Sequence, residues 1–118
     1  MDESFFFEKL KIYQRSLAFS TRICVIASGF PLKYSRIRDQ LIGAAISIPL
    51  NIAEGSGRKS PKERINFCNI SRASLFECVP ILEICKKLEL IEPPSADELK
   101  NETVELSKMI NGFIATIH

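Results

Sequence analysis

Apolar residues recur at three- and four-residue spacings along most of the chain, which is the period of an amphipathic α-helix. Three turns with glycine, serine and proline interrupt this period and leave four segments. We predict helices at about residues 4–28, 35–54, 61–88 and 96–117. Four helices with short connections are typical of an all-α antiparallel up-down four-helix bundle.

The turns carry residues that end and begin helices. Gly29, followed by an apolar residue and a proline, predicts the end of the first helix. Gly55 predicts the end of the second helix, with Gly57 as a hinge. Ser60-Pro61-Lys62-Glu63 predicts an N-cap, a proline in the first turn and a capping box. Ser95-Ala96-Asp97-Glu98 has the same S-x-x-E pattern and predicts the start of the last helix.

The second and third predicted helices are apolar on two sides. One stripe of the second helix contains Ile37, Leu41, Ala44, Ala45, Ile48 and Ile52, and a nearly opposite stripe contains Ile42, Ile46, Leu50 and Ala53. The two stripes of the third helix contain Ile65, Cys68, Leu75, Val79 and Leu82, and Phe67, Cys78, Ile81, Cys85 and Leu88. A domain of this size is too small to surround a helix completely. The surplus apolar face therefore predicts a homo-oligomer.

Polar side chains form a narrow wedge between the stripes of the second helix: Gln40, Ser47, Asn51 and Glu54. Pro49 lies within this helix, where it removes a backbone donor and predicts a kink. We expect the wedge to form a polar seam that fixes helix or subunit register, with Glu54 offset by Arg58 or Arg72. A ligand or catalytic site that uses Glu54 at a subunit interface is the alternative.

The composition is that of a folded, reduced protein. With 118 residues, of which 46% are hydrophobic and 25% charged, we expect one domain over residues 1–118. The four cysteines contain no C-x-x-C pair and fall among apolar residues, so we expect no metal site. Neither a signal peptide nor a membrane-spanning run is evident, which favours a cytoplasmic protein without a membrane partner.

The usual catalytic patterns are absent from the sequence. The one histidine is the terminal His118, so neither a Glu-x-x-His di-iron pair nor an internal Ser-His or Cys-His nucleophile can form. The Gly55–Ser60 turn, GSGRKS, departs from the P-loop pattern and follows a predicted helix rather than a strand. We expect no enzyme, no catalytic residues and no cofactor.

Positive charge gathers in the middle of the chain. The net charge is only +2, but residues 33–64 hold seven basic and three acidic side chains, whereas residues 65–118 hold five and eight. Arg58 and Lys59 also precede a predicted helix N-terminus, where anions are favoured. The candidate phosphate contacts are Arg36, Arg38, Arg58, Lys59, Lys62 and Arg64.

Three segments carry a resemblance: FEKLKIYQRSLAFS, GFPLKYSRIRDQL and AAISIPLNIAEGSGRKSPKERINFCNISRASLFE. They are similar to the four-helix-bundle family of 23S ribosomal RNA intervening-sequence proteins, over nearly the whole chain. The resemblance implies a left-turning up-down bundle that assembles as a ring, most often a pentamer. It also implies kinship with the accessory variability proteins of diversity-generating retroelements, whose basic bundle ring binds nucleic acid and a reverse transcriptase.

One departure from the family concerns charge. After Gln40-Leu41 the family commonly carries paired basic residues, whereas this chain has Ile42-Gly43. We expect a non-enzymatic, self-assembling interaction module whose further partners are RNA or DNA, and another protein such as a reverse transcriptase. The alternative is a purely protein-binding scaffold without nucleic-acid contact.

Overall fold

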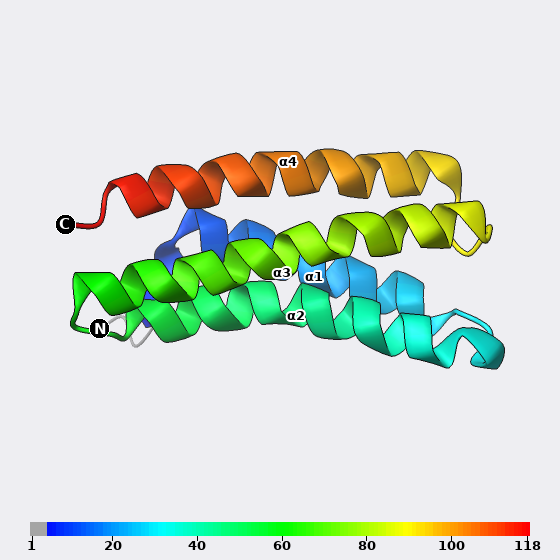
Figure 1. Ribbon diagram of the computed structural model, residues 1–118, viewed down its shortest axis with the longest axis horizontal. Helices are drawn as coiled ribbons and strands as arrows, with labels where there is room; N and C mark the ends of the chain where they lie inside the picture. Colours follow the sequence, from blue (N-terminus) through cyan, green and yellow to red (C-terminus); the bar gives the residue numbers. More distant parts are fainter. Residues whose placement is uncertain (1–4) are drawn as a thin grey trace.

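Four helices in one antiparallel bundle make up the computed structural model, which describes residues 5–118 (Figure 1). The bundle measures 44 × 29 × 22 Å along its principal axes. Its four helices are α1, Lys11–Ser28; α2, Ser35–Ser56; α3, Pro61–Lys87; and α4, Pro93–Ala115. Two short 3-10 helices precede α1 and α2: η1, Phe6–Lys9, and η2, Leu32–Tyr34. The predicted all-α up-down bundle is confirmed.

Each helix packs against its neighbours in chain order, and α4 returns to α1 to close the bundle. The packing is closest between α2 and α3 and loosest between α1 and α4. Ion pairs span that loose seam: Arg15 Nη2 lies 2.8 Å from Glu102 Oε1, and Arg22 Nη2 lies 2.7 Å from Glu98 Oε2. The diagonal helices lie farther apart than the adjacent ones, and Figure 1 shows α1 behind α3. The molecule therefore has distinct α1 and α3 sides.

Aliphatic side chains from all four helices fill the centre. Those with the least exposure include Ile23, Leu41, Ile48, Leu75, Leu82, Leu99, Leu106 and Ile110. Burial of each contributes about 1.5–3 kcal/mol relative to leaving it in water. The heptad-like spacing of these residues therefore fixes which face of each helix turns inward.

The first helix begins later than its sequence pattern predicts. Leu10 adopts an extended conformation (φ −76°, ψ 130°), so η1 is separated from α1. The η1 turn is held by the Phe5 amide, which donates to Glu8 Oε1 at 2.9 Å, and by Gln14 Nε2, which donates to the Glu8 carbonyl at 2.8 Å. The predicted start at Ser4 lies outside the described residues. The predicted end is confirmed, with Gly29 as C-cap.

The prediction that Gly55 ends the second helix is wrong. Helix α2 continues through Ser56, and Gly57 is its C-cap. Gly55 is buried inside the last turn because α3 approaches there: a Cβ on this residue would lie 2.7 Å from the Phe67 Cβ. The glycine serves close packing between α2 and α3 rather than helix termination.

The two predicted capping boxes differ in outcome. Ser60 is the N-cap of α3 as predicted, with its Oγ accepting from the Glu63 amide at 3.4 Å, and Pro61 opens the helix. The predicted start at Ser95 is wrong, because α4 begins at Pro93 with Glu92 as N-cap. The proline pair fits a first helical turn, where φ near −65° is required and no backbone donor is needed.

The two apolar sides of α2 are confirmed, since Ile46 and Leu50 are exposed while Leu41 and Ile48 lie in the core. The second stripe predicted on the third helix is largely wrong. Its members Cys78, Ile81 and Cys85 are buried, because α3 packs against α2 on one side and α4 on the other. The exposed large apolar residues of α3 are Ile70, Phe76, Ile84 and Leu88.

Candidate functional site

The α2–α3 turn, residues 57–60, is the centre of the predicted anion site. Arg64, one turn into α3, folds back over it: its Nε donates to the Arg58 carbonyl and its Nη2 to the Lys59 carbonyl, both at 2.9 Å. These bonds satisfy carbonyls that the turn would otherwise leave to water. Arg64 therefore holds the turn together instead of presenting its guanidinium fork outward.

Arg58 is also engaged by its own subunit. Its Nη2 donates to Glu54 Oε1 at 2.5 Å, and its guanidinium lies 4.9 Å from the centre of the Phe67 ring. The predicted offset of Glu54 by Arg58 is thus confirmed, and the alternative partner Arg72 instead donates to Asn111 Oδ1 at 2.6 Å. Because the Arg58–Glu54 pair is about half exposed, it adds little to stability.

Lys59 and Lys62 are the free cations of this turn. Both are exposed, and neither side-chain ammonium has a hydrogen-bond or ion-pair partner within residues 5–118. A lysine ammonium on an exposed turn can turn toward a phosphate without breaking an existing contact. These two side chains are therefore the best placed of the six predicted contacts.

Arg36 and Arg38 do not join the turn. They lie in the first turn of α2, whereas Arg58 follows its last, so the two groups are roughly 30 Å apart along the helix. Arg38 Nε pairs with Asp39 Oδ1 at 2.9 Å. Arg36 is exposed and without a partner within residues 5–118. The six predicted residues thus form two groups at opposite ends of the bundle.

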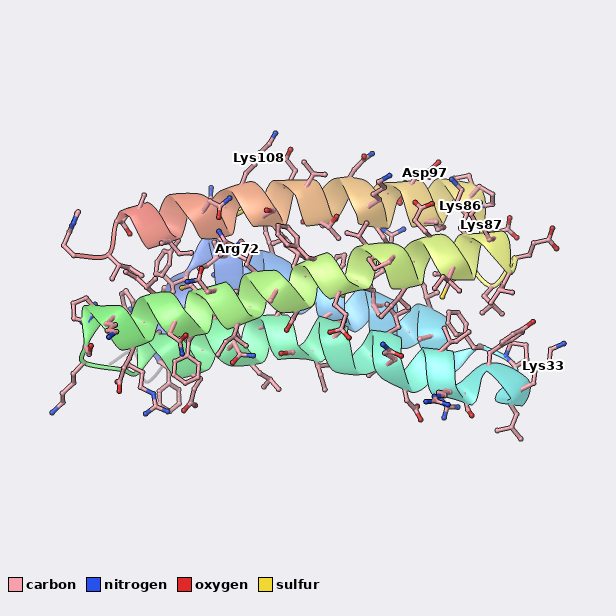
Figure 2. The ribbon with its side chains drawn as sticks, in the orientation of Figure 1. Lys33, Arg72, Lys86, Lys87, Asp97 and Lys108 are labelled. Atoms are coloured by element: carbon pink, nitrogen blue, oxygen red, sulfur yellow. The ribbon has the colours of Figure 1, made fainter. Side chains whose placement is uncertain are left out.

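At the Arg36 end of the bundle, some cations are paired with carboxylates and others are not. Figure 2 shows Lys33 pointing away from the bundle, while Lys86 and Asp97 lie together where α3 and α4 meet. Lys86 Nζ donates to Asp97 Oδ1 at 2.9 Å, and this hydrogen bond raises the pKa of Lys86. Asp39 and Asp97 thus pair with Arg38 and Lys86, and these two cations of the Arg36 end are already engaged.

The predicted polar seam forms in part. Asn51 Nδ2 donates to the Ser47 carbonyl at 2.7 Å and to Ser47 Oγ at 2.8 Å. Ser47 Oγ lies 2.9 Å from Ser74 Oγ on α3, and the fully buried Ser71 Oγ donates to the Ile48 carbonyl at 2.9 Å. The Asn51 bonds span Pro49 within α2, and the bonds of Ser71 and Ser74 join α3 to α2 just before Pro49. They fix the register of the two helices.

Two predicted members lie outside this seam, and two true members were missed. Gln40 is exposed, and Glu54 faces Arg58 at the turn. Ser71 and Ser74 supply the α3 half of the network. Their three-residue spacing places them on one helix face, which is the signal that could have paired them with Ser47.

An apolar groove of about 510 Å³ runs between α1 and α2 on the outside of the bundle. We call it the α1–α2 groove; its lining includes Phe7, Tyr13, Leu17, Cys24, Ile46, Pro49, Leu50 and Ala53. Leu50 is 62% exposed, which is unusual for a leucine in the middle of a helix. The groove coincides with the second apolar stripe predicted on α2.

The buried thiols have no reactive surroundings. Burial raises the pKa of Cys68 and Cys85, and burial followed by the charge of Glu77 raises the pKa of Cys78 to about 12.

No group of three or more His, Cys, Asp or Glu side chains within residues 5–118 is arranged to hold a metal ion. None of the helices in that range combines the length and apolar character needed to cross a bilayer.

These features define a small all-α protein of the up-down four-helix-bundle class. The model of the 23S rRNA-intervening sequence protein family matches residues 8–112, so the chain belongs to this family. Among solved structures, it is similar to a protein of unknown function from the S23 ribosomal protein family of Bacteroides thetaiotaomicron. The two are 25% identical with a TM-score of 0.80, over 89% of this chain and 99% of the other. No curated protein matches the chain.

Proposed function

We propose that the chain is a non-enzymatic interaction module that assembles into a closed ring of identical subunits, a pentamer. The observation that carries self-assembly is the exposed apolar α1–α2 groove with Leu50 at its rim. Contiguous apolar surface of this kind marks protein contact sites on soluble proteins. The number five comes from the family resemblance described above.

A ring also needs a second, different face, because each subunit contacts one neighbour ahead and one behind. Phe76 is 57% exposed on α3, which lies diagonally opposite α1 in the bundle. Ile70 and Ile84 are exposed on the same helix. Two apolar surfaces on opposite sides favour head-to-tail association over a twofold dimer.

Light scattering after size exclusion tests self-assembly. We expect the wild-type protein to elute as a homo-oligomer and Leu50→Glu to elute as a monomer with an unchanged helical circular dichroism spectrum. Leu32→Glu is the matched control, because Leu32 is more exposed but lies in η2, away from the groove. A wild-type monomer at micromolar concentration would overturn the proposal and favour a scaffold that offers these faces to a different chain.

We further propose that the ring binds nucleic acid through phosphate contacts at the α2–α3 turns. The unpaired Lys59 and Lys62 support this role. Cyclic symmetry would bring every copy of the turn to the same end of the ring, so that two lysines per subunit become a continuous band of cations. The family description also refers to 23S rRNA, in keeping with a nucleic-acid setting.

Fluorescence anisotropy with labelled RNA and DNA tests the phosphate contacts. We expect binding to weaken steeply with salt, and Lys59→Glu with Lys62→Glu to weaken it at every salt concentration. Lys100→Glu with Lys108→Glu changes the net charge equally on α4, and Figure 2 shows Lys108 pointing away from the bundle. An equal loss of affinity in the two double variants would mean that only net charge matters, and it would overturn the α2–α3 turn as the binding site.

A further inference from the structure

Two phenylalanines next to the α2–α3 turn have no role in the fold that explains their exposure. Phe5 and Phe6 are 68% and 67% exposed. Phe5 is held by half-buried Phe7: the two rings stack at 5.6 Å with 11° between their planes, and Phe7 packs edge-on against Tyr13 at 4.9 Å. The stack leaves the outer face of the Phe5 ring open to solvent.

These rings share a hollow with charged groups of the turn. The hollow, of about 630 Å³, is lined on one side by the three phenylalanines and on the other by the end of α2 from Leu50 to Arg58. Phe7, Leu50 and Ala53 also line the α1–α2 groove, so the hollow adjoins the proposed subunit contact. Lys59 directly follows Arg58 and is unpaired within residues 5–118. Flat aromatic faces and unpaired lysines therefore lie close together at this end of the bundle, and we call the hollow itself the aromatic hollow.

We propose that the aromatic hollow binds an unpaired stretch of a single-stranded polynucleotide, with bases stacked on Phe5 and Phe6 and phosphates at Lys59 and Lys62. This inference rests on the phosphate contacts proposed above and names the strand type that they serve. Aromatic side chains beside a basic groove are the arrangement by which proteins hold single strands without sequence preference. The Arg58–Glu54 pair would sit beneath the strand, where the carboxylate can accept from a base amino group.

A duplex does not fit the same hollow. Its bases are stacked on one another and present only their edges in the grooves, so the open ring faces of Phe5 and Phe6 would find no partner. A duplex could still contact the lysines through its phosphates. The aromatic rings therefore should discriminate between single and double strands, whereas the lysines should not.

The test compares strands of about 12 nucleotides, within the site size typical of such grooves. Oligouridylate, oligothymidylate and an RNA duplex are titrated against full-length protein by fluorescence anisotropy. The key variant, Phe5→Leu with Phe6→Leu, keeps apolar bulk and removes the aromatic faces. Tyr34→Leu is the matched control, because it removes an aromatic ring from η2, at the opposite end of the bundle. A third variant, Phe5→Trp with Phe6→Leu, restores one aromatic ring relative to the double leucine variant.

We expect the double leucine variant to bind both single strands about tenfold more weakly and the duplex unchanged, with Tyr34→Leu unaffected and Phe5→Trp with Phe6→Leu regaining affinity. Equal affinity of the leucine variant and the wild type for single strands would overturn the inference. So would an equal loss on the duplex, or a change in oligomer mass, which would assign the rings to subunit contact.

The lysine variants separate this inference from the proposal on which it rests. If Lys59→Glu with Lys62→Glu abolishes binding while the leucine variant does not, the phosphate contacts stand and the aromatic platform fails. If the wild type binds no strand, both fail. Oligouridylate lacks the methyl group of oligothymidylate but carries a 2′-hydroxyl, so a preference for oligouridylate would add a contact with the 2′-hydroxyl.

Discussion

Gly55 packs directly against Phe67, so closely that a methyl group at residue 55 would lie 2.7 Å from the Phe67 Cβ. Atoms that close cannot coexist without a shift, and the Phe67 Cβ is tied to the α3 backbone. The closest helix pair of the bundle therefore meets at a residue that has no side chain. The adjoining cation contact of Arg58 with the Phe67 ring depends on the same approach.

Gly55→Ala is expected to destabilise the protein by about 1–2 kcal/mol, because overpacking outweighs the gain in helix propensity. Gly43→Ala in the same helix is expected to stabilise by about 0.5–1 kcal/mol, since nothing lies within 4 Å of the added carbon. Chemical denaturation at one fixed protein concentration measures both. A stabilising Gly55→Ala would contradict the close approach of α2 and α3.

Glu89→Gly is expected to stabilise by about 1 kcal/mol. Glu89 has φ 60° just after α3, where its amide donates to the Lys86 carbonyl at 3.1 Å and the Leu90 amide donates to the Cys85 carbonyl at 2.9 Å. This is a Schellman ending, whose left-handed position favours glycine. Thermal denaturation measures the effect. Glu92→Gly, in the same loop but outside the left-handed position, should give no such gain.

Arg64→Lys is expected to lower the free energy of unfolding by about 1–2 kcal/mol, because an ammonium cannot reproduce the two carbonyl contacts of the guanidinium. Hydrogen exchange in residues 57–60 should quicken in parallel. The salt dependence of nucleic-acid binding should stay the same, since the charge is retained. A flatter salt dependence would instead assign Arg64 to a phosphate.

Stability is expected to fall as the pH rises above about 9. The unfolded chain loses the Cys78 proton near pH 9, whereas the folded chain keeps it until about pH 12. Between these values the unfolded state binds fewer protons, so the free energy of unfolding declines by roughly 1 kcal/mol per pH unit for this thiol. Cys78→Ala should be less stable at neutral pH but show a shallower decline. Cys24→Ala, at a half-buried thiol, is the control.

Local patterns in the sequence predicted the bundle and the exposed side of α2, because amphipathic period and turn residues are encoded within each helix. These patterns could not predict that the second apolar stripe of α3 is buried, because its burial depends on α2 and α4 packing against α3 from two sides. The same limit applies to the predicted cation cluster. Spacing placed Arg58 and Arg64 near one turn, but their partners, Glu54 and the turn carbonyls, depend on the folded backbone.

The loose packing between α1 and α4 bears on whether subunits of a ring can exchange a helix. Of the four helices, α4 makes the least extensive contacts with the rest of the bundle, so we expect it to separate at the lowest free energy, with loss of the bidentate Arg15–Glu102 pair. The connection at residues 88–92 joins α4 to α3. In a ring of closely spaced subunits, a released α4 could insert into its neighbour's seam, so the assembled state would be open to domain swapping through its last helix.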